Sequence, residues 1–547
     1  MRCEARAGVM AAAAAGAAVW LACSPAGEAS PHPAWTPSRV VVPGAFHVHT
    51  TRSDGSETVD AVAAAASRAG LRFVLFTDHG DGTRPPEAPA YRHGVLCLDG
   101  VEVSTSGGHY VAFDLPRTPY PLAGDPRDVI QDVARLGGFG VAAHPDSPKA
   151  QLRWTAATSR IDGIEWLNMD SAWRAAPAWT FGRAAVTYFF EPPEGLTLLL
   201  ARPERALARW DRLTRERPVV GFAATDAHGG LRSLAGHAFP SYEACFRSFT
   251  TRVELPAPLT GHAAADGQAI TAALRAGHHY TTLDGMARPE AFEFRAKSRG
   301  SVFFEGDRLP AGPAILQARV DAPPGARIVL LRNGAILDEA RPPELVYRAD
   351  GRRAAYRVEV RIGSDGRAPW IASNPIYVGM PEETESASPL PAEAMDGPSL
   401  LDRAWHPEVG GGSSARVIAG QGGLRLVYSL GPGAPGNQFA AAVAPLPDDL
   451  NAFASLTIRG RSDRPVRMSV QLRARGPNPP RWWRSVYLDR TVRTATLHLA
   501  RFTPASPDAA ARPALARIGA IMLDVDVNHA APGAAGAVVL TGMWLGR

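Results

Sequence analysis

The stretch from Arg39 to Phe294 constrains the fold most, because short apolar runs alternate there with amphipathic helical patterns. Such alternation predicts a mostly parallel sheet or an α/β barrel, in which helices connect successive strands. The expected strands are Ala45–His49, Leu71–Thr77, Val95–Val103, His109–Phe113, Phe139–Ala143, Ile161–Leu167 and Pro218–Ala224. The helical patterns between them are Thr58–Arg68, Pro126–Leu136 and Pro203–Arg215.

The remainder of the 547 residues has a different pattern. A chain of this length is too long to fold around a single hydrophobic core, so we expect several domains. Short strands separated by Pro/Gly turns predict a small β-sandwich over residues 299–380. Residues 381–399, rich in Pro, Glu, Ser and Ala, predict a linker. Seven further strand patterns predict a β jelly roll over residues 400–547, which is similar to galactose-binding-like carbohydrate modules.

The first 29 residues have the layout of an export signal. Arg2 and Arg6 precede an apolar run that ends near Ala22 and is too short and alanine-rich to favour a membrane span. The segment around Cys23 resembles a lipoprotein cleavage site with Cys23 as the lipidated residue, and cleavage near Ala29 is the alternative. We therefore expect an exported protein of the periplasm or cell envelope, with any membrane attachment through a lipid on Cys23. A buried N-terminal helix is the competing interpretation.

Cysteine usage and charge exclude some functions. Cys97 and Cys245 have no C-x-x-C spacing, which argues against a zinc finger, and two buried free thiols are favoured over a disulfide. The net charge of +5 comes without a Lys/Arg stripe interleaved with aromatic residues. The sequence therefore carries no strong signal for nucleic-acid binding.

Metal-ligating residue types recur at the expected strand ends. Alternate residues of a strand point to the same face, so His47 and His49 project together and could share an ion. Asp54 follows on the next loop. Further candidates stand in the later segments, all but His109 at or just past the end of an apolar strand: His79, Glu102, His109, His144, Asp226 and His228. Any single histidine could be a structural residue, which is the interpretation preferred for His93, His237, His262, His278 and His279.

The ordered set resembles the PHP family, named for polymerase and histidinol phosphatase. The matching motifs are His47-x-His49 with Ser53-Asp54-Gly55, Thr77-Asp78-His79, Glu102 with His109, Ala143-His144-Pro145 and Asp226-x-His228. The resemblance covers residues 39–298 and implies a distorted (β/α)7 barrel that holds three divalent metal ions.

The resemblance also implies a division of the ligands. One ion would take His47, His49, Glu102 and Asp226, and the second would share Glu102 and add His109 and His144. The third would be held by Asp54, His79 and His228. No ligand position is missing, which argues against a degenerate, non-catalytic copy.

Imidazole and carboxylate ligands without thiolate suit Zn²⁺, Mn²⁺ or Fe²⁺. Three such ions carry more positive charge than three carboxylates carry negative charge, so the site would favour an anionic substrate. A hydroxide that bridges the ions could attack a phosphoryl group without a separate general base. Asp226 or a free histidine could move the proton, and Arg153 and Arg232 are candidates for phosphate binding.

These features predict an exported metal-dependent phosphoesterase that hydrolyses a phosphomonoester such as a nucleotide or a sugar phosphate. Alternatives are a phosphodiesterase or 5′–3′ exonuclease acting on oligonucleotides, a hydrolase of amides or esters, and a carbohydrate- or envelope-binding protein whose barrel is only a scaffold. Asn168 and three tryptophans could line the site: Trp154, Trp166 and Trp173. The C-terminal domain could bind polysaccharide through Trp482 and Trp483, although such a pair in a β-sandwich is more often partly packed in the core.

Overall fold

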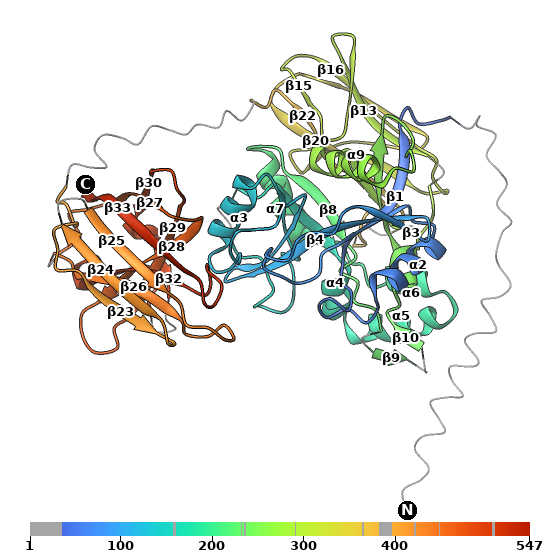
Figure 1. Cartoon of the computed structure of the whole chain (residues 1–547). Coiled ribbons are helices and arrows are strands. Elements are labelled where there is room, and N and C mark those ends of the chain that lie inside the picture. The colour runs from blue at the N-terminus through green and yellow to red at the C-terminus, as the bar shows by residue number, and fades with distance from the viewer. Residues whose placement is uncertain are drawn as a thin grey trace, which may run out of the picture. The chain divides into compact units, whose positions relative to one another are not determined.

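The computed structural model describes residues 35–156, 160–230, 232–234, 237–289, 291–363, 366–381, 397–420, 423–447, 449–505 and 509–547 (Figure 1). The expected leader with Cys23, and most of the expected linker, lie outside these residues. Among the helices described, none is both long and apolar enough to cross a membrane. Cys97 and Cys245 are free and buried, as expected.

A curled sheet forms the N-terminal part of the described chain. Its strands are β1 (Val40–Val48), β2 (Phe73–Phe76), β4 (Val95–Thr105), β5 (Gly108–Phe113), β6 (Phe139–Ala142), β7 (Gly163–Asn168), β8 (Val220–Ala224) and β11 (Thr250–Leu255). They follow the order β11-β1-β2-β4-β5-β6-β7-β8, and short β3 (Ala90–Arg92) pairs with β4. The pairs β1–β2, β2–β4, β6–β7 and β7–β8 are parallel.

The middle of this sheet departs from the expected parallel order. β5 runs antiparallel to both β4 and β6. Only Ser106 and Gly107 separate β4 from β5, and two residues can connect antiparallel strands but cannot form a parallel crossover.

The last strand of the curl, β8, approaches β1. The backbone N–H of Thr225, just after β8, donates to the carbonyl of Phe46 in β1 at 3.0 Å. The N–H of His49 donates to the carbonyl of Ala227, also at 3.0 Å. The sheet thus curls until the end of β8 meets β1 near the carboxyl ends of both strands, and the full (β/α)7 arrangement stays a prediction.

Alternate strand residues divide between two buried cores. In β2, Phe73 and Leu75 pack inside the curl, whereas Val74 and Phe76 face the helices outside. Phe46 stacks on Phe222 inside the curl, with ring centroids 4.5 Å apart. α9 (Ala263–Ala276) adds Ile270 and Leu274 to the inner core.

The three helices expected from the sequence are present as α2 (Val59–Ala69), α3 (Pro126–Arg135) and α7 (Glu204–Thr214). Thr58 caps α2 by accepting a hydrogen bond from the N–H of Ala61, and Asp125 caps α3. Five further α-helices of the described residues were not anticipated: α9 and α4 (Met169–Ala175), α5 (Ala178–Phe190), α6 (Pro192–Thr197) and α8 (Tyr242–Ser248).

Residues 279–378, from β12 to β22, form a small β region that continues the curled sheet. β12 (His279–Thr282) pairs with β11 and with β21 (Ile371–Ser373), which leads on to β20 (Ala354–Arg361), β22 (Ile376–Val378) and β15 (Arg308–Leu309). β17 (Arg327–Arg332) and β18 (Ala335–Ala340) extend from β20. A separate four-stranded sheet contains β14 (Ser301–Phe304), β13 (Phe292–Ser298), β16 (Ala314–Val320) and β19 (Glu344–Ala349).

The C-terminal residues form two sheets around one core, as the β pattern predicted, and the jelly-roll connectivity stays a prediction. One sheet contains β23 (His406–Gly410), β26 (Phe439–Pro445), β32 (Ile518–Asp526), β28 (Val466–Ala474), β29 (Arg481–Leu488) and β31 (Thr503–Pro504). The other contains β24 (Ser414–Gly420), β25 (Gly423–Ser429), β33 (Ala535–Gly546), β27 (Ser455–Ser462) and β30 (Arg493–His498). Trp482 lies in the core between them.

A fully buried arginine, Arg467 of β28, forms ion pairs with two carboxylates of α3. Its guanidinium lies 3.1 Å from Asp128 and 2.7 Å from Asp132. A buried guanidinium needs such partners, because an unpaired charge away from water is costly. The C-terminal domain therefore makes a specific contact with α3 in addition to its covalent connection through residues 381–399.

Candidate metal centre

Three candidate ligands have an unusual backbone conformation. The φ angles of His47, His144 and Asp226 are 66°, 28° and 46°, in the left-handed region that non-glycine residues rarely adopt. At His47 this coincides with an irregularity in the β1–β2 pairing between Phe46 and Val48. Such strain persists only where the surroundings enforce it, and it concentrates at functional sites.

Four donor atoms meet at the end of β1. The Nε2 atoms of His47 and His49 lie 3.1 Å apart. Each Nε2 also lies near Glu102 Oε2, at 3.3 and 3.2 Å, and near Asp226 Oδ1, at 3.4 and 3.3 Å. Ligands placed tetrahedrally about 2.0–2.1 Å from an ion lie about 3.3 Å from one another. The atoms of His47, His49 and Glu102 therefore fit a single divalent ion, and Asp226 Oδ1 approaches the same two imidazoles. These are the four residues to which the PHP resemblance assigned the first ion.

Glu102 stands at the middle of the wider cluster. Its second oxygen, Oε1, lies 2.8 Å from His109 Nδ1 and 2.9 Å from His144 Nε2. Its other oxygen, Oε2, which faces His47 and His49, also lies 3.2 Å from His79 Nδ1. A carboxylate between five imidazoles is suited to bridging two ions. The proposed second group of Glu102, His109 and His144 is thus brought together, and His79 also approaches it.

The third proposed group lies at the exposed edge of the cluster. Asp54, with 55% of its side chain exposed, has Oδ2 3.6 Å from His79 Nε2 and 3.3 Å from His228 Nε2. Its Oδ1 lies 3.4 Å from His49 Nδ1. His49 thus presents one ring nitrogen to each of two groups, a contact that the family pattern did not include.

The electrostatics of the cluster indicate a cation site. Burial raises the pKa of Glu102 and of Asp226, but the surrounding histidines outweigh it and hold both pKa values well below the ordinary range. Burial alone would lower the pKa of His49 and of His144, yet the neighbouring carboxylates raise both to about 9. Buried carboxylates that stay ionised need compensating positive charge, which protons on the imidazoles or divalent ions can supply.

Glu165, which sequence reasoning missed, orients two of the ligands. Its Oε1 accepts a hydrogen bond from His47 Nδ1 at 2.6 Å, and its Oε2 accepts from the backbone N–H of His144 at 2.7 Å. A carboxylate on the second nitrogen of a ligating histidine selects its tautomer and ring orientation. The available signal was an acidic residue inside the apolar run Ile161–Leu167.

Asn168, at the end of β7, links Glu165 to the cluster. Its side-chain amide donates to Glu165 Oε2 at 2.9 Å and to Asp226 Oδ2 at 3.1 Å. Its carbonyl oxygen accepts from the N–H of Ser171 and caps α4. The expectation that Asn168 lines the site agrees with this placement.

Asp78 organises the loop that carries Asp54. Its Oδ1 accepts from the N–H of Thr50 at 2.7 Å and from the hydroxyl of Ser53 at 2.7 Å, and its Oδ2 accepts from the hydroxyl of Thr50 at 2.8 Å. Asp78 therefore acts on loop geometry, a role that its place in the Thr77-Asp78-His79 motif did not indicate.

The arginines proposed for phosphate binding are placed less clearly. The Nε of Arg153 donates to the carbonyl of Ser147 at 2.8 Å, and its backbone lies against Gly108, where an added Cβ would come within 2.5 Å of the Arg153 carbonyl. Among the described residues, no contact joins its guanidinium to a candidate ligand. The backbone of Arg232 lies in β9 (Arg232–Leu234), which pairs with β10 (His237–Phe239), and its side chain is outside the described part of the chain.

The tryptophans differ in role. Trp154 is buried and stacks on Tyr110, and Trp173 is buried with its Nε1 donating to Asp170. Trp166 lines a cavity that also includes His144, Glu165 and Asn168.

Other histidines are engaged elsewhere. His93 pairs with Asp60 at 3.0 Å, and His278 pairs with Asp307 at 3.0 Å. Burial lowers the pKa of His279 to about 3, so this imidazole is neutral. His262 precedes α9 without capping it, and the side chain of His237 lies outside the described residues.

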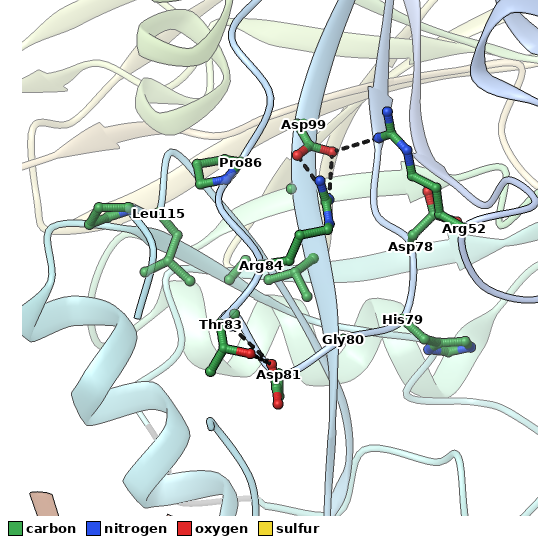
Figure 2. A pocket seen from close by; sticks show the side chains of 15 residues that line it. Arg52, Asp78, His79, Gly80, Asp81, Thr83, Arg84, Pro86, Asp99 and Leu115 are labelled. Atoms are coloured by element: carbon green, nitrogen blue, oxygen red, sulfur yellow. Dashed lines mark hydrogen bonds and ion pairs between the residues drawn. The ribbon is translucent and has the colours of Figure 1, made fainter. Parts of the chain in front are cut away.

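A small cavity of about 150 Å³ lies beside His79. Figure 2 shows Arg52 and Arg84 reaching Asp99, with Arg84 Nη2 2.9 Å and Arg52 Nη1 3.3 Å from its carboxylate. Arg52 also pairs with Glu87, so two internal carboxylates neutralise the two guanidiniums, and this cavity is poorly suited to binding an anionic substrate.

Comparison with family models found no match, and no curated protein matches the chain. Among solved structures, a two-domain protein from Bacteroides vulgatus containing a predicted PHP-like metal-dependent phosphoesterase is 14% identical and covers 64% of this chain and 99% of its own, with a TM-score of 0.32. A suggested metal-dependent phosphoesterase from Bifidobacterium adolescentis is 16% identical over 36% of this chain and 91% of its own, with a TM-score of 0.23. The family 11 carbohydrate-binding module of a Clostridium thermocellum cellulase is 18% identical over 26% of this chain and 88% of its own, with a TM-score of 0.22. At these scores the assignment of function depends on the side chains.

Proposed function

We propose that this protein is a metal-dependent phosphoesterase that hydrolyses a phosphomonoester. The observation that carries the proposal is the meeting of donor atoms around the His47 and His49 Nε2 atoms, which lie 3.1 Å apart and which Glu102 and Asp226 each approach to 3.2–3.4 Å. Around it, His109, His144 and the Asp54 group offer two more places for divalent ions of the Zn²⁺, Mn²⁺ or Fe²⁺ type.

When bound, such ions ionise water near neutral pH and polarise phosphoryl oxygens. The protein's own contribution is to hold the ligands in place before substrate arrives. Glu165 keeps Nδ1 of His47 protonated, so that Nε2 presents its lone pair to the cluster. Asn168 holds Asp226 Oδ2 and leaves Oδ1 facing the two histidines.

Asp226 is the proposed site of proton transfer. Its carboxylate lies 3.4, 3.3 and 3.7 Å from His47, His49 and His228, so it could guide a proton released in the cluster to the imidazole of His228 at the exposed edge. The path of the proton from the buried cluster to solvent is then short, because His228 and the exposed Asp54 lie next to each other at the edge of the cluster.

The test combines metal analysis with turnover. The purified full-length protein should contain divalent metal and should release phosphate from small phosphomonoesters faster than from bis(p-nitrophenyl) phosphate or an oligonucleotide. His144→Asn should lose most of this activity, whereas His93→Asn, which alters a histidine paired with Asp60 outside the cluster, should keep it. A metal-loaded protein without activity on any phosphoester would overturn the proposal, and preference for the oligonucleotide would favour the exonuclease alternative.

Two accessory roles belong to the same proposal. We propose export to the periplasm or cell envelope on the basis of Arg2, Arg6 and the apolar run before Cys23. We also propose that the C-terminal domain binds a polysaccharide, although Trp482 is buried and Trp483 packs near Gly124, which removes the two tryptophans as the binding surface. A carbohydrate would have to bind elsewhere on its two sheets.

A further inference from the structure

A cavity of about 590 Å³ opens directly beside the candidate metal centre. His144, Glu165 and Asn168 line one part of it, so it is continuous with the residues that hold the cluster. Its volume falls in the range of sites that bind drug-sized molecules and far exceeds what a phosphate group alone needs. It therefore has room for the organic part of a substrate.

The walls of the cavity are largely apolar. α4 contributes Ala172, the segment before α5 contributes Pro177, and α5 contributes Trp179, whose side chain is 73% exposed. Trp166 and Leu199 add further apolar surface. An apolar or aromatic body would gain free energy by covering these side chains, whereas a polyhydroxylated sugar would leave its hydroxyls with few partners there.

Three arginines also line the cavity, and they differ in their partners. Arg202 forms a two-point ion pair with Glu359, at 2.8 and 2.9 Å. Arg205 lies 3.6 Å from Asp146. Arg367, which comes from the loop before β21, has no ion pair with any residue that the structure describes.

The surroundings of Arg367 favour an incoming anion. Its guanidinium is partly desolvated, and burial, with the nearby positive charge of Arg183, lowers its pKa. Among the described residues, Glu194 is the carboxylate that acts against this lowering. A cation in this setting is stabilised by an external anion.

We propose that this cavity binds the alcohol part of the substrate, and that this part is an apolar, aromatic body carrying a second anionic group that pairs with Arg367. The inference deepens the proposed phosphoesterase function and rests on it. It also gives the small β region, through Gly366 and Arg367, a direct part in specificity.

The test uses product-like probes, so that it does not depend on turnover or on metal loading. Binding of 2-naphthol and of 6-hydroxy-2-naphthoate to the full-length protein is measured by calorimetry. The wild type should bind both and should prefer the carboxylate. Arg367→Gln should weaken binding of the naphthoate about tenfold and leave binding of the naphthol unchanged, since a charge-assisted hydrogen bond is lost. Ala172→Phe, which fills the cavity, should weaken binding of both.

The matched control is Arg348→Gln, an exposed arginine of β19 that does not line the cavity, and it should bind both probes as the wild type does. Thermal unfolding of each variant identifies any that fail to fold, and Arg367→Gln, at a partly exposed position, tests the proposal independently of Ala172→Phe. The inference is overturned if neither probe binds, or if Arg367→Gln leaves naphthoate binding unchanged. Hydrolysis of glycerol 2-phosphate by the same preparations tests the phosphoesterase function separately.

Discussion

Glu165 Oε1 accepts a hydrogen bond from Nδ1 of His47 at 2.6 Å, and both side chains are fully buried. This contact decides which nitrogen of His47 can face an ion, because the protonated Nδ1 leaves the lone pair on Nε2. Glu165 therefore belongs to the metal centre although it approaches no ion position itself.

Glu165→Gln should lower metal content and reduce kcat/KM by about 10- to 100-fold, as changes behind a metal-ligating histidine commonly do. The amide keeps the size of the side chain but removes the charge that holds the His47 proton. Metal content by elemental analysis and kinetics on a small phosphomonoester measure the two effects. Glu339→Gln, in the small β region, is the control, and equal metal content and rate in both variants would exclude an orienting role.

Glu102→Gln should have a larger effect than Asp54→Asn. Glu102 lies within 3.3 Å of five histidines, so losing its charge weakens two ion positions, whereas Asp54 belongs to one exposed group. We expect Glu102→Gln to abolish measurable turnover and to lower the metal content by more than one ion per chain. Asp54→Asn should lower it by one ion at most. Full metal occupancy and activity in Glu102→Gln would rule out bridging.

The pH dependence of stability should reveal a buried carboxyl away from the metal centre. Burial raises the pKa of Glu254 to about 8, with Glu293 and Asp307 adding to the shift against the opposing effect of Arg39. The folded state therefore keeps a proton that the unfolded chain releases above pH 4.5. The contribution of Glu254 to the free energy of unfolding is fully present below that pH. It falls by up to about 1.4 kcal/mol per pH unit as the pH rises towards 8.

Glu254→Gln should flatten this decline, because the amide needs no proton to remain neutral. Thermal unfolding midpoints at pH 5, 6, 7 and 8 compare the variant with the wild type. Parallel curves for the two proteins would show that Glu254 is not the titrating group.

A chain ending at Met380 should keep kcat/KM on a small phosphomonoester to within a few-fold. Every candidate ligand lies between His47 and His228, and Asp128 and Asp132 would become hydrated once Arg467 is removed. In the full chain, by contrast, Arg467→Met should destabilise the protein, but by less than the roughly 3–5 kcal/mol of a pair broken outright, since Asp132 keeps Arg135 at 3.1 Å and Asp128 keeps Arg484 at 3.8 Å. Loss of turnover in the folded truncated chain would mean that the C-terminal domain contributes to catalysis.

Fractionation should locate the mature protein outside the cytoplasm. If Cys23 carries a lipid, the wild type should be found with membranes and Cys23→Ser should be released into the soluble exported fraction. A wild type that is already soluble outside the cytoplasm would exclude lipidation but not export, whereas retention in the cytoplasm would contradict both.

The expected helices and strands were recovered best where local signals were strong. α2 and α3 begin next to capping residues, Thr58 and Asp125, which act within a few residues of the helix start. The antiparallel β4–β5 pair was missed because it depends on the length of a turn that the general α/β pattern obscured. The helices α4 to α6 were missed because they follow one another almost directly, and the composition of the sequence changes little between them. Their boundaries depend on packing.

The sequence by itself determined the types and order of the candidate ligands. Each of them lies next to a strand that can be recognised from its own short run of apolar residues. Only the tertiary structure decided that Glu165 orients His47 across 118 residues, and that Arg367 of the small β region lines the same cavity as His144. The physical reason is that hydrogen bonds and cavities depend on the distances between side chains from separate segments. A sequence pattern specifies which face a residue occupies but not what meets it there.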